Sequence, residues 1–137
     1  MAIRLDQTQA LRLWHGALAC SVRCDGPDLS ARQMAILLTV YLSPEPHTVR
    51  GLAADLNVSK PAVTRALDRL AGFGFIRRAR DEADRRSVLL RRTVKGSVYL
   101  SEFAALIGDA YDGLQQPARI SSGDGAAILA EPSPDGA

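Results

Sequence analysis

The stretch TVRGLAADLNVSKPAVTRALDRLAGFG, residues 48–74, decides the fold because it contains two short amphipathic segments separated by a tight turn. Thr48 and Ser59 are good N-cap residues, and each precedes a run in which apolar side chains return every three or four positions. Asn57–Val58 supplies the turn, and Pro61 lies in the first turn of the second segment, where its missing N–H costs nothing. Two short helices joined in this way predict a helix-turn-helix. The buried stripes are expected to be Val49, Leu52, Ala53 and Leu56 in the first helix and Val63, Ala66, Leu67 and Leu70 in the second.

The second of these helices, residues 59–72, is expected to expose a small and basic face opposite its apolar stripe. Arg65 can donate two hydrogen bonds to guanine, and Thr64 can bond a base edge or touch a thymine methyl group, so both are predicted base readers. A generic helical pair that binds no DNA is the alternative at this stage. The predicted DNA-facing residues of the helix are Ser59, Lys60, Pro61, Thr64 and Arg65, with Ser59 and Lys60 on phosphates.

The next stretch, RRARDEADRR at residues 77–86, contains nothing apolar larger than alanine. Its composition favours a charged helix, because Arg, Ala and Glu are good helix formers. Two short β-prone runs flank it, however, and a helix would leave them without a common face. We therefore predict a β-hairpin that packs Ile76 and the side carrying Val88 and Leu90 on the helix-turn-helix, with residues 81–86 in solvent at its tip.

Further helices are predicted on both sides of this region. Residues 5–24 carry a wide apolar face, and residues 31–42 follow the cap residue Ser30 and are apolar on most sides, so they should form the most buried helix. A long helix after Thr93 runs towards Pro117, and part of its apolar stripe is expected to pair with a second subunit. The alternative is that this stripe folds back on the N-terminal helix of the same chain.

The predicted fold is mainly α with a small β-hairpin wing: a winged helix-turn-helix flanked by N- and C-terminal dimerisation helices, in a single domain. The predicted regions are an N-terminal helix in 1–28, the winged helix-turn-helix in 29–96, the long helix in 97–117, and a mobile tail in 118–137 that is rich in Gly, Ser, Pro and Asp.

The charge of the chain is distributed unevenly, although the net charge is only +2. Residues 48–96 contain 12 Lys and Arg against five Asp and Glu, a local charge of +7, and the rest of the chain carries −5. Ten of these 12 cations are arginines, which favours paired hydrogen bonds to phosphate or guanine. A basic segment in an otherwise acidic protein predicts a local polyanion-binding surface.

Several classes of function are not expected. The first residues, MAIRLDQTQ, lack the apolar core of a signal peptide, and no apolar run is long enough for a membrane span, so we predict a cytoplasmic protein that does not bind membranes. Two histidines and two cysteines without ligand spacing predict no metal and no cofactor. The sequence also lacks a nucleophile–base set, a phosphate-binding glycine loop and paired carboxylates, so we predict no enzymatic activity.

Residues 29–96 closely resemble the MarR family of bacterial transcriptional regulators. The resemblance is carried by LSARQMAILL, by the stretch from Thr48 to Arg78, and by DEADRRSVLLRRTVKG, in which Asp84-x-Arg86 with Thr93 and Gly96 downstream is the most family-specific pattern. The chain departs from the family pattern at Arg92, where leucine is usual. It also lacks the usual final helix, or has only a vestige of it.

The resemblance implies a homodimeric repressor or activator that binds a near-palindromic operator in double-stranded DNA. The helix at 59–72 would enter the major groove and the wing, residues 77–91, would reach the flanking minor groove. By position in the motif, Arg86 would be the minor-groove residue and Asp84 would orient it through an ion pair, while Arg77 and Arg85 would contact phosphates. A winged-helix module that contacts a polymerase or another regulator is the alternative function.

Two further features suggest regulation. MarR relatives often bind small aromatic effectors, and Trp14, His15, Met34 and Tyr41 are the residues expected to line such a pocket, although plain core packing of Trp14 and Met34 is the favoured alternative. Some relatives sense oxidants through a cysteine; here Cys20 and Cys24 are the candidates, and small buried thiols are the default.

The adjacent Arg91 and Arg92 should point to opposite faces of a strand, so one can face DNA while the other lies against protein. For Arg92 a structural ion pair with an acid elsewhere is the favoured role.

Overall fold

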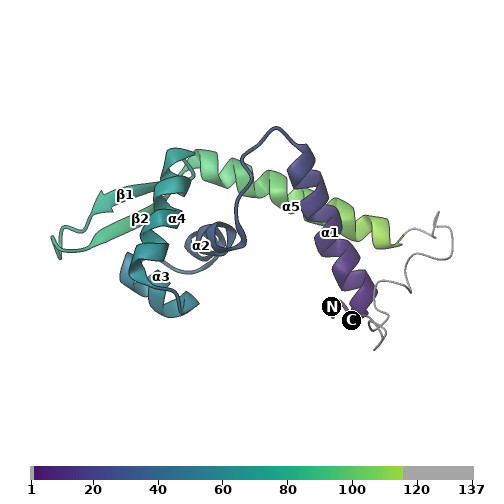
Figure 1. Cartoon of the computed structure of the whole chain (residues 1–137), viewed down its shortest axis with the longest axis horizontal. Helices are drawn as coiled ribbons and strands as arrows, with labels where there is room; N and C mark the ends of the chain where they lie inside the picture. Colours follow the sequence, from purple (N-terminus) through teal and green to yellow (C-terminus); the bar gives the residue numbers. More distant parts are fainter. Residues whose placement is uncertain (1, 116–137) are drawn as a thin grey trace, which may run out of the picture. The chain divides into compact units, whose positions relative to one another are not determined.

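The computed structural model describes residues 2–115, and this part of the chain contains five helices and one two-stranded antiparallel hairpin (Figure 1). The predicted fold class, mainly α with a small β-hairpin, is therefore confirmed. The tail predicted at 118–137 lies outside the described residues. None of the helices in the described range is long and apolar enough to span a membrane. In chain order the elements are α1 (Gln7–Arg23), α2 (Ala31–Leu42), α3 (Val49–Leu56), α4 (Lys60–Gly72), β1 (Ile76–Arg80), β2 (Val88–Arg92) and α5 (Val94–Gln115).

The described residues form two compact units. The first consists of residues 2–24 and 103–115, which include α1 and the C-terminal part of α5. The second consists of residues 25–102 and includes α2, α3, α4, the hairpin and the start of α5. The region predicted to bind DNA, residues 29–96, lies within the second unit.

Each helix of the second unit begins at the cap residue that the sequence indicates. The Ser30 hydroxyl accepts a hydrogen bond from the Gln33 N–H, and the Gln33 side chain accepts one from the Ser30 N–H, which completes a capping box. The remaining caps also accept hydrogen bonds from backbone N–H groups three residues on: Thr48 from Gly51, Ser59 from Ala62 and Thr93 from Gly96. These bonds satisfy donors that have no partner inside a helix, so the helix starts are determined locally.

The turn of the helix-turn-helix depends on Asn57, which adopts a left-handed backbone conformation with φ 52°. Asparagine tolerates this conformation better than most residues, because its short polar side chain can bond locally. The Val58 N–H then donates to the Ala53 carbonyl, which closes the end of α3, and Ser59 starts α4 at once. The two helices are therefore held at a fixed angle by a turn of very few residues.

The core of the second unit is a single apolar cluster. From α2, Ile36 and Leu37 are fully buried as predicted, together with Val40, whereas Met34 is only half-buried. The buried face of α4 is the stripe that helical spacing predicts. The other members of the cluster are Leu52, Val63, Ala66, Leu67, Leu70, Phe75, Ile76 and Leu90.

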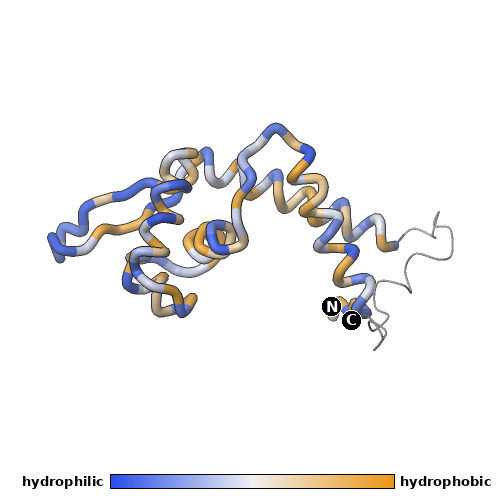
Figure 2. Tube along the Cα trace, viewed as in Figure 1, coloured by the Kyte–Doolittle hydropathy of each residue, from blue (hydrophilic) through white to orange (hydrophobic). Residues whose placement is uncertain are grey.

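The stretch at 77–86 forms most of the first strand and the tip of the predicted hairpin, and not a charged helix. In its register Ile76 faces Arg92, Arg78 faces Leu90, and Arg80 faces Val88. Ile76 and Leu90 are buried, but the expectation that Val88 joins them in the core is wrong, since Val88 is 43% exposed. Val88 lies near the free end of the hairpin, beyond the helices that cover Leu90. Figure 2 shows hydrophilic residues gathered at that free end.

The first unit packs α1 against the C-terminal part of α5. Gly16 makes a close approach possible, because a Cβ atom at this position would lie 3.0 Å from the Cβ atom of Ala110. Ala17 is fully buried, but one long face of α1 is exposed. That face carries Leu11, Trp14, Leu18 and Val22, which are 50%, 51%, 40% and 64% exposed. Core packing of Trp14, the favoured alternative to an effector contact, is therefore wrong in the described part of the chain.

Candidate nucleic-acid interface

The exposed side of α4 has the residues that the sequence predicts. Lys60, Pro61, Thr64 and Arg65 are all exposed, while Val63 and Leu67 on the opposite side are fully buried. Ser59 is also exposed, although its hydroxyl is already engaged as the N-cap of the helix. A rigidly packed helix thus presents small, hydroxyl and basic groups in its first two turns, which is the composition that base-edge recognition needs.

The hairpin tip is ordered by its own acidic residues. The Asp81 carboxylate accepts a hydrogen bond from the Ala83 N–H at 2.9 Å. The Asp84 carboxylate accepts one from the Arg86 N–H at 3.0 Å and one from the Ser87 hydroxyl at 3.2 Å. Aspartate commonly organises turns in this way by replacing backbone acceptors. The two acids therefore shape the loop that carries Arg86.

The predicted ion pair between Asp84 and Arg86 is absent from the described residues. Asp84 contacts the backbone N–H of Arg86 and not its guanidinium group. The physical reason is distance along the chain: a carboxylate two residues upstream reaches the main chain in a tight turn more readily than it reaches the end of a long side chain. Asp84 thus orients the backbone from which Arg86 extends, and the guanidinium group of Arg86 has no acidic partner within residues 2–115.

Arg78, for which the sequence indicates no role, makes an ion pair with Asp68. This contact joins β1 to the exposed side of α4. Because the two side chains are 38% and 62% exposed, the ion pair is expected to stabilise the fold by less than about 1 kcal/mol. Because Asp68 is paired with Arg78, it is not a free negative charge on the exposed face of α4.

The remaining wing arginines have no such partner among residues 2–115. The ion pairs in this range involve Arg78 and Arg91, so the guanidinium groups of Arg77, Arg85 and Arg86 are not neutralised by an adjacent acid. All three are exposed. The hairpin is therefore a basic arm that extends from the helix-turn-helix, with Asp81 and Asp84 engaged in the turn. Its arginines at 77, 85 and 86 are available to an anionic partner.

A scan against family models matches residues 29–88 to the MarR family. Over these residues the chain is similar to the MarR family. Members of this family are transcriptional regulators and not enzymes. The match covers the capped helix α2, the helix-turn-helix and most of the hairpin, which are the elements described above. The search of curated proteins gave no match.

Solved structures of MarR-family and related regulators show the same fold. The transcriptional repressor CouR bound to a 23-mer DNA duplex is 27% identical, with a TM-score of 0.62 over 77% of this chain and 72% of that chain. A cysteine-to-serine mutant of MarR from E. coli, complexed with operator DNA, is 26% identical, with a TM-score of 0.59 over 90% of this chain and 81% of that one. YusO from Bacillus subtilis, 21% identical, has a TM-score of 0.66 over 79% and 74% of the two chains and shows the fold alone.

The four residues predicted to line a MarR-type effector pocket are divided between the two units. Trp14 and His15 belong to the first unit, and Met34 and Tyr41 to the second. The Tyr41 hydroxyl is engaged by the main chain, since it lies within hydrogen-bond distance of Phe75 O and of both the N–H and the carbonyl of Thr93. An effector bound by these four residues stays a prediction.

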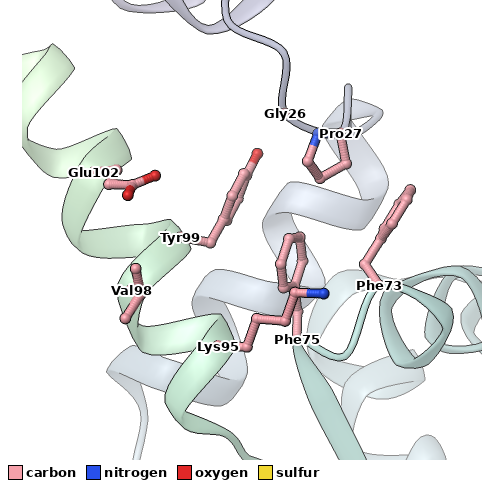
Figure 3. Close-up of a pocket in the computed structure, with 8 residues that line it drawn as sticks. All are labelled: Gly26, Pro27, Phe73, Phe75, Lys95, Val98, Tyr99 and Glu102. Carbon is pink, nitrogen blue, oxygen red and sulfur yellow. The ribbon is translucent and has the colours of Figure 1, made fainter.

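The second unit contains a pocket of about 260 Å³ that the sequence does not indicate (Figure 3). None of the four predicted effector residues lines it. One wall consists of side chains from the start of α5, and the aromatic residues that follow α4 lie opposite. The lining residues are Gly26, Pro27, Phe73, Phe75, Lys95, Val98, Tyr99 and Glu102.

The cysteines lie at the end of α1, as predicted, and both are free thiols. Cys20 is half-buried, but Cys24 is exposed, so the default expectation of two small buried thiols is wrong for Cys24. The Cys24 N–H donates to the Cys20 carbonyl as the helix ends. An oxidant-sensing role stays a prediction. Within the described residues, no group of three or more His, Cys, Asp or Glu side chains is arranged to hold a metal ion.

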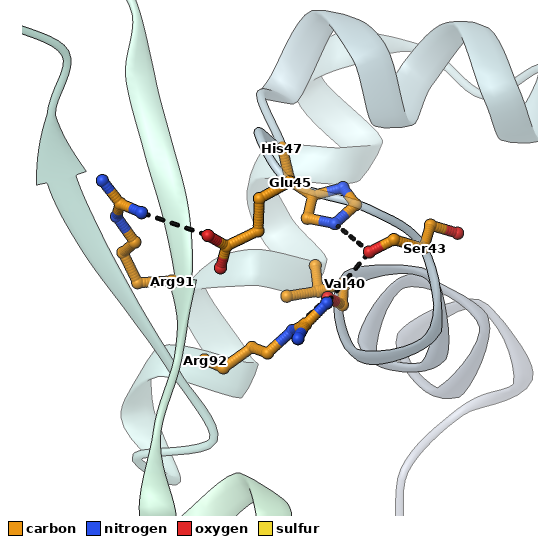
Figure 4. A network of polar contacts seen from close by, with 6 residues as sticks. All are labelled: Val40, Ser43, Glu45, His47, Arg91 and Arg92. Atoms are coloured by element: carbon orange, nitrogen blue, oxygen red, sulfur yellow. Dashed lines mark hydrogen bonds and ion pairs between the residues drawn. The ribbon is translucent and has the colours of Figure 1, made fainter.

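The predicted ion pair of Arg92 is wrong. Its guanidinium group donates to the carbonyl oxygens of Val40 and Ser43, and it is the neighbouring Arg91 that makes an ion pair, with Glu45 (Figure 4). The reason is that the C-terminus of α2, with its unpaired carbonyl groups, lies beside this end of β2. The only sequence signal was a charged residue at a position where the family usually has leucine.

Proposed function

We propose that this chain is a DNA-binding transcriptional regulator of the bacterial cytoplasm that acts as a homodimer on a near-palindromic operator. The observation that carries the proposal is the combination of an exposed, basic α4 face with a wing in which Arg77, Arg85 and Arg86 have no acidic partner among residues 2–115. Two similar regulators, MarR from E. coli at 26% identity and the repressor CouR at 27%, have been solved with DNA, which supports the same partner here.

In this proposal α4 enters the major groove. Thr64 and Arg65 read base edges, because they are exposed in the first two turns, where a docked helix comes nearest to the bases. Lys60, with the hydroxyl of Ser59 and the apolar ring of Pro61, contacts the sugar-phosphate backbone beside them. These contacts fix the register of the helix, while the two readers supply the discrimination between sequences.

The wing reaches the adjacent minor groove in the same proposal. Arg86 is the residue inserted there, since the backbone that carries it is held by Asp84 and its guanidinium group is exposed. A narrow A·T-rich minor groove concentrates negative potential, and a planar guanidinium group fits it. Arg77 and Arg85 contact the flanking phosphates.

The homodimer is supported by the exposed face of α1. Leu11, Trp14, Leu18 and Val22 form one continuous apolar stripe at helical spacing, which is costly to leave in water and is typical of an interface. A twofold dimer places two reading helices on two half-sites, which is why a near-palindromic operator is expected.

The test is the salt dependence of DNA binding by the full chain. Bound fragments are selected from genomic DNA, and the affinity for the best fragment is measured by fluorescence anisotropy at several salt concentrations. We expect the logarithm of affinity to fall linearly with the logarithm of salt, with a slope near −0.9 for each phosphate contact. Binding with little dependence on salt, or no selected fragment, would contradict the proposal and favour a protein partner.

The variant Arg86→Ala tests the wing. We expect it to weaken binding to the selected fragment by roughly tenfold or more, because one inserted guanidinium contact is lost. Arg32→Ala is the matched control, since it removes the same charge from an exposed position at the start of α2, outside the proposed interface. Wild-type affinity in the Arg86→Ala protein, with its fold verified by circular dichroism, would refute the wing model.

A further inference from the structure

Two adjacent arginines at the end of β2 hold the segment between α2 and α3 from opposite sides of the strand (Figure 4). Arg91 reaches Glu45, with 3.2 Å between Nη1 and Oε2. Arg92 reaches the end of α2: its Nε donates to the Val40 carbonyl at 2.9 Å and its Nη2 to the Ser43 carbonyl at 2.9 Å. Because side chains of successive strand residues point to opposite faces, the pair encloses the segment.

The bonds made by Arg92 satisfy carbonyl groups that α2 itself cannot. The last carbonyl groups of a helix have no partner inside it, and a cation near them is favoured by the helix dipole. The Ser43 carbonyl is shared with the buried imidazole of His47, whose Nε2 lies 3.1 Å away. A carbonyl oxygen can only accept, so the hydrogen of the imidazole is on Nε2 in this contact. Arg92 and His47 thus cap the end of α2 together.

Main-chain contacts also attach the segment between α2 and α3 to β2. The Leu90 N–H donates to the His47 carbonyl at 2.9 Å, and Thr48 forms an isolated antiparallel bridge with Leu89. Thr48 is also the N-cap residue of α3. The base of the wing is therefore tied at one place to the end of α2 and to the start of α3.

We propose that Arg92 is a positioning residue for DNA recognition: by binding the Val40 and Ser43 carbonyls it sets the direction in which the wing leaves the helix-turn-helix, without touching DNA. This inference rests on the proposed function. Two of its donor groups are directed at protein carbonyls, so the side chain is held away from the role of a phosphate contact.

The geometry of a hairpin makes this position sensitive. Arg86 lies in the turn, six positions before Arg92 and two before the start of β2, so it is at most about 20 Å from Arg92 at roughly 3.3 Å per residue. A rotation of about 5° at Arg92 therefore displaces Arg86 by between about 1 and 2 Å, which is enough to break a hydrogen bond. Leucine, the residue usual at this position in the family, cannot hold two carbonyls, so this restraint is a property of this chain.

The first experiment needs no DNA. Amide hydrogen exchange is measured for wild type, Arg92→Leu and the matched control Arg32→Leu, which removes the same charge from the other end of α2. In Arg92→Leu we expect exchange of the Leu90 amide and the neighbouring wing amides to be about tenfold faster, and in Arg32→Leu to be unchanged. Unchanged exchange in Arg92→Leu would overturn the inference.

The second experiment is a double-mutant cycle on affinity for the selected DNA fragment, with Arg92→Leu, Arg86→Ala and the double variant. Arg92→Leu should weaken binding about three- to tenfold, but it should weaken it no further once Arg86 is absent, because it acts through the wing. Losses that multiply in the double variant would show that Arg92 acts independently of Arg86 and would overturn the inference. If the Arg92→Leu protein folds and binds DNA with unchanged affinity, Arg92 has only a structural role, and the inference is overturned as well.

Arg92→Lys provides rescue and a second test if Arg92→Leu does not fold. A lysine ammonium can bond one of the two carbonyls but lacks the planar fork, so affinity and exchange should lie between those of wild type and Arg92→Leu. If only Arg92→Lys folds, wild-type values in both measurements would overturn the inference. Failure of the proposed function would be seen in a different measurement: the wild-type protein would then not bind DNA with a steep dependence on salt.

Discussion

The hydroxyl group of Tyr41 joins three parts of the second unit, and its removal is a sharp test of the fold. This hydroxyl accepts a hydrogen bond from the Thr93 N–H at 2.8 Å. It lies 2.8 Å from the Phe75 carbonyl and 3.0 Å from the Thr93 carbonyl, and its single proton can be donated to one of them at a time. Tyr41 in α2 thereby connects the residue before β1 with the residue that caps α5.

Tyr41→Phe keeps the ring and removes only these hydrogen bonds. Two partially buried backbone groups, the Thr93 N–H and the Phe75 carbonyl, would lose a partner. Each buried group left unsatisfied costs about 1–3 kcal/mol, and relaxation or entering water reduces the total. We therefore expect the free energy of unfolding to fall by about 2–4 kcal/mol, a large share of the roughly 5–15 kcal/mol typical of a folded protein.

The assay is urea unfolding followed by circular dichroism, with the slope compared between variants so that only a shift of the midpoint is read as a change in stability. Tyr111→Phe is the matched control, because Tyr111 is half-buried in the first unit and its hydroxyl has no hydrogen-bond partner among the described residues. That variant should change stability by less than about 0.5 kcal/mol. A similarly small effect of Tyr41→Phe would refute the reasoning.

Two further predictions concern the same unit. Gly96→Ala would bring a Cβ atom into overlap with the Tyr41 hydroxyl and the Phe75 carbonyl, and since a backbone carbonyl cannot move aside cheaply we expect a loss of about 3 kcal/mol or more, or failure to fold. Gly108→Ala is the control, because Gly108 lies in the interior of α5 with open space around it, and this variant should be stabilised by up to about 1 kcal/mol. The stability of both variants is measured by thermal unfolding. A Gly96→Ala protein as stable as wild type would contradict the close packing of Gly96 against Tyr41 and Phe75. Asp68→Asn removes the exposed ion pair with Arg78 and should lower the free energy of unfolding by less than about 1 kcal/mol in low salt and by less still in high salt; a loss above 2 kcal/mol, measured by urea unfolding, would show that the pair matters more than its exposure implies.

The sequence by itself determined the helices, the turn between α3 and α4, and the face of α4 that is exposed. These features follow from interactions within a few residues: cap hydroxyls such as Ser30 and Ser59 bond N–H groups three positions on, and the period of apolar residues separates a buried side from an open one. The hairpin at 77–86 was also predictable, although its composition favours a helix, because its apolar flanks needed one common face.

Only the tertiary structure decided the partners of the charged and aromatic side chains. Arg92 binds carbonyls 49 and 52 positions away, Arg91 pairs with a carboxylate 46 positions away, and the Tyr41 hydroxyl bonds the main chain at Thr93, 52 positions away. No local pattern encodes such pairs, since they depend on which surfaces the packed core brings together. For the same reason the sequence could not show that Trp14 is exposed, that Val88 lies beyond the core, or that Asp84 bonds the backbone of Arg86 instead of its guanidinium group.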